Sequence, residues 1–319
     1  MSNTLPRLLR REQAAFLLRD GRAWGDHLNR VRAFLGEGLR AADPARPVLI
    51  LGAGSGLEVP WELAPHRTTG WDADPWSRVW TLLRHQRWPR WVFEDLTGGF
   101  TDLEVAARRA IAEPWSGRRR HLELGARRLT GLLPFLQPDP APLRAWIALH
   151  RPGTILVANV MGQFSVVAER LVEAALGGNP WRSDPEQADP LAEALEAWTR
   201  KALTAFLAVL RESGADLWLV HDRAVLWGGR PLVLGPWEEV WSSQLQTNGA
   251  PLEASDALAG VDVPALLAGG SLELTQKERW IWPLAPGQRH LVEALALLGR
   301  APGGVASVNP HTRGRHEQT

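Results

Sequence analysis

The chain has 319 residues and a formal net charge of +1, from 36 Lys and Arg against 35 Asp and Glu. This length allows two domains or one elaborated domain, and the balanced charge gives no whole-molecule field that favours nucleic acid, a membrane or an acidic partner. The sequence contains no cysteine, which excludes disulfides, thiolate metal sites and cysteine nucleophiles.

The first hundred residues predict an α/β arrangement. Apolar residues recur at helical spacing up to about residue 42, so residues 1–44 are expected to form an N-terminal helical segment. The apolar run at 48–51 and later strand-like stretches then alternate with helical ones, which predicts strands at 48–51, 68–72 and 91–93 and helices at 57–64 and 76–85. This alternation is typical of a parallel sheet with helices on both faces.

A long insertion follows the third predicted strand. Nearly sixty residues lie between Asp95 and Thr154, with helical stretches at 101–113, 117–133 and 141–150. A single crossover helix needs far fewer residues. The segment 96–153 is therefore predicted to add a helical cap near the carboxyl ends of the strands.

The remaining chain continues the sheet. Strands are predicted at 154–158 and 217–220, with a helix at 164–176 and another after Asp189. Later strand-like pieces and a final helix are expected at 231–234, 238–242, 279–284 and 288–299. Residues 45–300 are interpreted as one domain that includes the insertion, and residues 301–319 as a flexible tail.

A glycine-rich loop, Gly52-Ala53-Gly54-Ser55-Gly56, directly follows the first predicted strand. Glycine permits a sharp turn and lets a ligand approach the backbone without a Cβ clash. The dinucleotide fingerprint would place its third glycine at position 57, which is Leu57 here. The spacing G-x-G-x-G instead resembles the first motif of class I S-adenosylmethionine-dependent methyltransferases.

This resemblance covers residues 45–165, and less clearly the chain up to residue 285. It implies a Rossmann-like methyltransferase sheet whose last two strands, near 237–241 and 280–284, are antiparallel, and it implies S-adenosylmethionine as the cofactor. Asp72, twenty residues after Gly52, would hold the ribose hydroxyls, with Asp74 as the nearby alternative. The other implied cofactor-binding residues are Gly52, Gly54, Gly56, Asp95 near the adenine amino group and Asn159 beside the reacting methyl.

Candidate substrate-handling residues lie outside that motif set. His221 and Asp222 follow the fifth strand, where strand ends face the ligand crevice, and a histidine near its ordinary pKa is a plausible base; the alternative is a strand-end histidine bonded to the backbone. The run Arg118-Arg119-Arg120 in the insertion would grip an anionic group of the substrate, or would simply form a solvated surface. The histidines form no metal-binding motif, so no metal is expected.

The preferred interpretation is methyl transfer from S-adenosylmethionine to a small-molecule acceptor. The alternatives are an RNA methyltransferase that docks through the Arg-rich N-terminal helices, and a non-catalytic Rossmann-like binding or regulatory protein. The first residues lack the apolar segment of a secretory signal, so a cytoplasmic location without membrane association is expected. Neither the acceptor atom nor the oligomeric state follows from the sequence.

Overall fold

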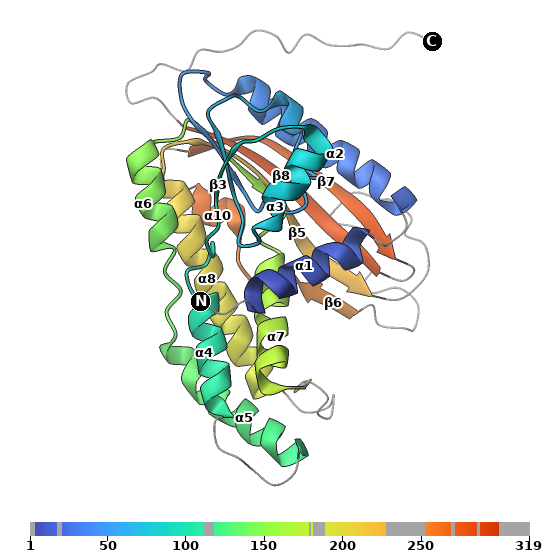
Figure 1. Cartoon of the computed structure of the whole chain (residues 1–319), viewed down its shortest axis with the longest axis vertical. Coiled ribbons are helices and arrows are strands. Elements are labelled where there is room, and N and C mark those ends of the chain that lie inside the picture. Colours follow the sequence, from blue (N-terminus) through green and yellow to red (C-terminus); the bar gives the residue numbers. More distant parts are fainter. Residues whose placement is uncertain are drawn as a thin grey trace.

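One β-sheet forms the centre of the protein (Figure 1). The computed structural model describes residues 4–17, 21–111, 118–178, 180, 189–227, 253–268, 272–285 and 288–299. The strands are β1 (Val48–Leu51), β2 (Thr68–Trp71), β3 (Arg90–Val92), β4 (Thr154–Ala158), β5 (Asp216–Trp227), β6 (Glu253–Asp256), β7 (Leu272–Ala285) and β8 (Gln288–Gly299).

The strand order fixes where a ligand can bind. Seven strands follow the order β3-β2-β1-β4-β5-β8-β7, and β6 pairs with the far end of β5. Strands β1 to β5 pair in parallel, whereas β8 is antiparallel to both of its neighbours. The chain leaves β1 toward β2 and returns on the other side of β1 as β4, so the order reverses between β1 and β4. Crevices at such switch points are the usual ligand sites of open α/β sheets.

Alternating side chains of the strands supply two apolar cores. Val48 and Ile50 of β1 pack in the cluster that contains Phe34 of helix α2 (Gly21–Ala41). Leu49 and Leu51 point to the opposite face. There they join the core formed with helices α7 (Gln163–Leu176) and α8 (Pro190–Glu212). The predicted α/β class is therefore confirmed, and the arrangement is consistent with a Rossmann-like fold.

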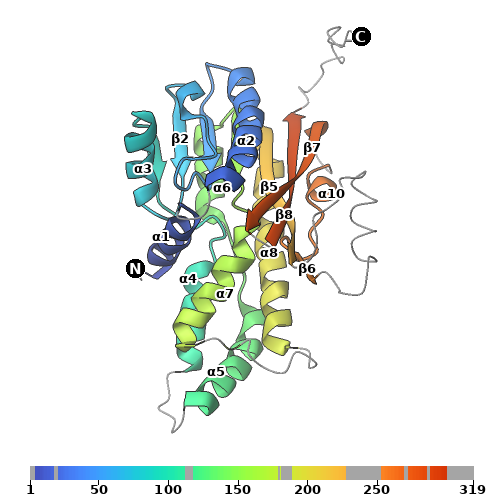
Figure 2. The ribbon, with the colours of Figure 1, turned by 90° about the vertical axis from the view of Figure 1, so that its right-hand side faces the viewer.

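The insertion forms the three predicted helices. They are α4 (Phe100–Ala110), α5 (Arg118–Leu132) and α6 (Ala141–His150), with a short 3₁₀ helix, η2 (Leu133–Phe135), before α6. Helices α4 and α5 pack with α7 and α8 into a helical extension that projects beyond the sheet (Figures 1 and 2). The remaining helices are α1 (Thr4–Leu17), α3 (Trp76–His85) and α10 (Val263–Leu267). None of the described helices is long and apolar enough to cross a lipid bilayer.

Two predicted helices are wrong. Residues 288–299 form strand β8, because an almost continuous apolar run fits a doubly buried strand as well as a helix. Hydrogen bonding to β5 and β7 on both edges decides in favour of the strand.

In the segment 57–64 only the 3₁₀ helix η1 (Trp61–Leu63) forms. Pro60 has no N–H to donate and restricts the preceding residue, which prevents a longer helix. The strand-like pieces predicted at 231–242 and the tail at 301–319 lie outside the described residues.

Helix α2 depends on a glycine where it crosses the sheet. A Cβ at Gly38 would lie 2.6 Å from Cγ of Trp218, whereas a Cβ at Gly25, in the same helix, would meet no atom within 4 Å. We expect Gly38→Ala to lower the free energy of unfolding by about 1–3 kcal/mol through overpacking. Gly25→Ala is the matched control and should raise it by up to about 1 kcal/mol. Urea unfolding of both variants measures the two values, and equal effects would contradict this packing.

Candidate functional site

The glycine loop adopts a backbone that favours glycine at three positions. Gly52, Gly54 and Gly56 have φ angles of 68°, 51° and 74°. A Cβ at Gly52 would also lie 2.4 Å from Cβ of Val160, which follows β4. The loop after β1 can therefore approach the loop after β4 only because residue 52 lacks a side chain, and this close approach forms the floor of a pocket at the switch point.

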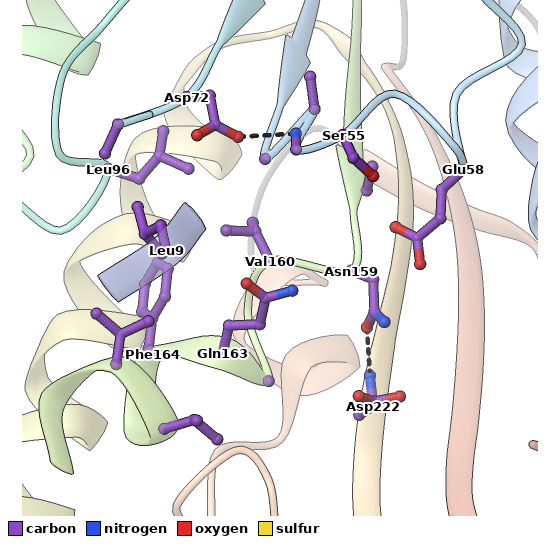
Figure 3. A pocket seen from close by; sticks show the side chains of 18 of the residues that line it. Leu9, Ser55, Glu58, Asp72, Leu96, Asn159, Val160, Gln163, Phe164 and Asp222 are labelled. Atoms are coloured by element: carbon purple, nitrogen blue, oxygen red, sulfur yellow. Dashed lines mark hydrogen bonds between the residues drawn. The ribbon is translucent and has the colours of Figure 1, made fainter. Parts of the chain in front are cut away.

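Asp72 ties the glycine loop to the end of β2. Its Oδ2 accepts a hydrogen bond from the Gly54 N–H at 2.7 Å (Figure 3), and its Oδ1 accepts from the Asp74 N–H at 2.8 Å. Burial raises the pKa of Asp72 to about 6, although the hydrogen bonds from the Asp74 and Gly54 N–H groups lower it in part. An ionised carboxylate offers about four acceptor positions in all, which is enough for it to bind a diol as well.

Asp74 has a different role. It is fully buried and does not line the pocket; its Oδ1 lies 3.2 Å from the Arg10 guanidinium of helix α1. Arg10 also lies over the Trp76 ring, 5.1 Å from its centroid. These contacts hold α1 over the pocket, where Leu5 and Leu9 form part of the lining. Of the two aspartates considered for ribose, only Asp72 faces the cavity.

Asp95 lines the pocket but is also engaged within its own turn. Its Oδ1 accepts from the Thr97 N–H at 2.8 Å, and its Oδ2 accepts from the N–H groups of Gly99 and Phe100 at 3.0 and 2.8 Å. These bonds start helix α4. Burial nonetheless raises the pKa of Asp95. The predicted contact with an adenine amino group stays a prediction.

Asn159 joins the ends of β4 and β5 at the pocket. It has a left-handed backbone with φ 46°, and its Oδ1 accepts from the Asp222 N–H at 3.1 Å (Figure 3). Its own N–H donates to the Val220 carbonyl at 2.9 Å. The residue therefore fixes the position of Asp222 relative to the glycine loop.

The lining of the pocket as a whole is anionic. Among the described residues that line it there is no Lys or Arg. Four carboxylates contribute to the lining: Glu58, Asp72, Asp95 and Asp222. Such a site favours a cationic ligand and repels phosphate groups.

The predicted partners His221 and Asp222 point in different directions. Adjacent side chains of a strand face opposite sides of the sheet, and β5 continues through both residues. Asp222 lines the pocket, whereas the fully buried His221 points toward Glu293, with its Nε2 3.9 Å from Glu293 Oε2. Burial lowers the pKa of His221 to about 4. The structure therefore does not bring His221 into the cavity.

Asp222 pairs instead with His290 of β8. Nδ1 of His290 lies 3.0 Å from Oδ2 of Asp222, and both residues line the pocket. Sequence reasoning missed His290 because residues 288–299 were expected to be helical. A strand prediction would have placed the residue beside β5, since β8 pairs with β5 in the register His290–Val225.

Aromatic side chains far apart in the sequence close the same end of the pocket. Trp24 of α2 and Trp282 of β7 both line it, with ring centroids 4.6 Å apart in an edge-to-face arrangement. His27 stacks on Trp282 at 3.8 Å and accepts a hydrogen bond from Trp280 Nε1 at 3.2 Å. Its Nε2 lies 3.4 Å from Oε1 of Glu58. No local motif in the sequence indicates this cluster, because its members come from both ends of the chain.

The arginine run lies away from the pocket. Helix α5 begins at Arg118 and packs against α4, α7 and α8 in the helical extension (Figures 1 and 2). No described residue of α5 lines the pocket, and the side chains of Arg118, Arg119 and Arg120 lie outside the described part of the chain. Of the described residues of the insertion, only Leu96 and Phe100, at its beginning, contribute to the lining. A substrate contact by this run stays a prediction.

The burial of His221 predicts a pH-dependent stability. The unfolded chain binds a proton at this residue below about pH 6.5, whereas the folded protein does so only near pH 4, so the folded state loses stability as pH falls through this window. Between pH 7.5 and pH 5 the loss amounts to about 2 kcal/mol. We expect His221→Leu to remove this pH-dependent loss from the free energy of unfolding, as measured by urea unfolding at the two pH values. His66→Leu, which replaces an exposed histidine, is the matched control; equal curves for the two variants would contradict the assignment.

Comparisons with known proteins leave the pocket as the basis for any functional assignment. No family model matches the sequence, and neither the curated proteins nor the solved structures contain a match to it. The function is therefore argued from the residues and geometry described above.

Proposed function

We propose that this protein transfers a methyl group from S-adenosylmethionine to a small-molecule acceptor. The observation that carries the proposal is the glycine loop at the switch point, bonded to Asp72, in a pocket whose described lining carries four carboxylates and no Lys or Arg. The sulfonium of this cofactor is a cation, so the charge of the pocket favours it. When bound, the cofactor supplies an electrophilic methyl group.

The same features argue against a dinucleotide. A pyrophosphate is usually held at the N-terminus of a helix that begins directly at the glycine loop. Here the loop ends at Gly56, and the next helix is the short η1, which starts at Trp61. The dinucleotide fold has a parallel sixth strand beside the fifth; here the antiparallel β8 occupies that place. A late antiparallel strand agrees with the methyltransferase resemblance.

Different residues along the pocket would bind the cofactor and exclude water from the reaction. Asp72 would accept hydrogen bonds from the two ribose hydroxyls at the β2 end, and the glycine loop lets the cofactor approach the backbone. Asn159 lies between this end and Asp222 (Figure 3). Leu9 of α1 and Phe164 of α7 supply apolar walls that exclude water from the cavity. Alignment of two reactants in such an enclosed site is the main contribution that a protein makes to a displacement reaction.

RNA methylation is a second candidate because of one surface feature. Helix α3 and the edge strand β3 carry exposed aromatic and basic side chains, with the Arg78 guanidinium 3.6 Å from the centroid of the Trp88 ring, which is 57% exposed. Stacking rings and arginines together are typical of surfaces that bind single-stranded nucleic acid. Salt-dependent binding of a single-stranded RNA that Trp88→Ala abolishes would favour this candidate.

Cofactor binding tests the primary proposal. We expect S-adenosylhomocysteine to bind the full chain in isothermal titration calorimetry at pH 7.5 and NAD to give no heat. Asp72→Asn should weaken binding by about 10- to 100-fold, since a hydrogen bond to a charged group contributes about 1.5–3 kcal/mol. Asp74→Asn should have a smaller effect, and Asp26→Asn, at an exposed position of α2, should have none.

The raised pKa of Asp72 predicts that the affinity for the ligand depends on pH. Below about pH 6 the empty protein protonates this carboxylate, so a ligand that needs its charge binds more weakly as the pH falls. We expect the affinity for S-adenosylhomocysteine to fall by about tenfold per pH unit below that pKa in the wild-type protein, and to change little in Asp72→Asn. Binding of NAD without binding of S-adenosylhomocysteine would overturn the proposed function.

A further inference from the structure

The end of the pocket opposite Asp72 has its own chemistry. Asp72 follows β2 and Asp222 lies on β5, and β1 and β4 separate the two strands. Three inter-strand spacings amount to about 14 Å. Figure 3 accordingly shows the two aspartates at different ends of the cavity, with Asn159 bonded to Asp222. A ribose bound at Asp72 therefore leaves the Asp222 end for a second molecule.

Asp222 is a buried carboxylate with one oxygen unused. The residue is 7% exposed, and its Oδ2 is occupied by His290. Its Oδ1 is buried and has no hydrogen-bond partner among the described residues. An unpaired acceptor in an apolar environment is costly unless a ligand satisfies it.

His290 holds the other oxygen of Asp222 in place. A carboxylate only accepts, so Nδ1 of His290 donates to Oδ2 of Asp222. Nε2 of the same ring lies 2.9 Å from Nε2 of Gln288. His290 is thus a positioning residue, and no Lys or Arg lines this pocket among the described residues. The free oxygen of Asp222 therefore suits a cationic N–H donor.

The surrounding rings suit an apolar body attached to such a donor. Trp24 and Trp282 both line the cavity, and the Trp282 ring lies 5.2 Å from the His290 ring between centroids. His27 covers Trp282 by stacking and is itself fixed by Trp280 and Glu58. Tryptophan attracts an ammonium group over its face and buries hydrocarbon against its surface. Glu58, which contacts His27, brings a second carboxylate to this aromatic part of the lining.

We infer that this end of the pocket, formed by Asp222, Glu58, Trp24 and Trp282, is a binding site for a small organic amine with an aromatic or alkyl body. The inference rests on the proposed function and names the substrate class of the same site: the amine is the methyl acceptor. Anionic substrates are repelled by the two carboxylates, and an alcohol of the same shape gains no ion pair with Asp222.

The amine binds as an ammonium and first passes one proton to Oδ1 of Asp222, the acceptor that has no partner among the described residues. The freed nitrogen lone pair would then form the new N–C bond while the bond between the methyl carbon and sulfur breaks with its electron pair left on sulfur. The product is a methylated ammonium, so the positive charge moves from sulfur to nitrogen, and the proton on Asp222 returns to solvent after product release. Asp222 is therefore assigned both the binding of the amine and the removal of its proton.

Three probes of nearly equal shape test the inference on the full chain. We expect phenethylamine to bind at least tenfold more tightly than 2-phenylethanol in calorimetry at pH 7.5, and 3-phenylpropanoate not to bind at millimolar concentration. Asp222→Asn should weaken phenethylamine binding at least tenfold and leave 2-phenylethanol and S-adenosylhomocysteine unchanged. Asp102→Asn, an exposed position on α4, is the matched control and should change none of these values.

The outcomes separate this inference from the proposed function. Equal affinity for the three probes, or no binding of phenethylamine at millimolar concentration, overturns the amine site even if S-adenosylhomocysteine binds. Selective amine binding without any binding of S-adenosylhomocysteine supports the amine site and overturns methyl transfer. The comparison of probes on the wild-type protein decides the matter even if Asp222→Asn does not fold.

Discussion

The hydrogen bond from the Gly54 N–H to the Asp72 carboxylate is the interaction on which the pocket depends. It joins the loop after β1 to the end of β2, while the missing side chain of Gly52 lets that loop meet Val160 after β4. Three neighbouring strands are thereby locked together at their carboxyl ends. The same carboxylate is kept in an environment that raises its pKa, so the group that shapes the loop is also poised to exchange its bonding with a ligand.

Features that depend on short stretches of sequence were predictable. Strands β1 and β4 are mainly apolar runs that end at a glycine or a polar residue, and the periodicity of the insertion indicated each of its helices. The glycine loop and Asp72 were predictable from spacing alone, because a strand, a turn and the next strand determine their positions. Local order of this kind needs no knowledge of distant contacts.

Features that depend on distant pairing were not predictable. The strand β8 satisfies a helical pattern equally well, and only its two neighbours decide its structure. His290 and Asp222 are 68 residues apart, and Trp24 meets Trp282 across most of the chain. His221 and Asp222 are consecutive in the sequence. Consecutive side chains of an extended strand point to opposite faces of the sheet, so the two groups do not meet in the pocket.

The position of β8 also governs the order in which the protein is completed during synthesis. This strand is the last described element, yet it lies inside the sheet, between β5 and β7. A ribosome releases β5 and β7 before the strand that joins them, so both expose unpaired edges until residues 288–299 emerge. His290 arrives with the same strand. The nascent chain therefore assembles its glycine loop early and finishes the Asp222 end of the pocket last, and any truncation that removes β8 leaves two open strand edges that invite aggregation.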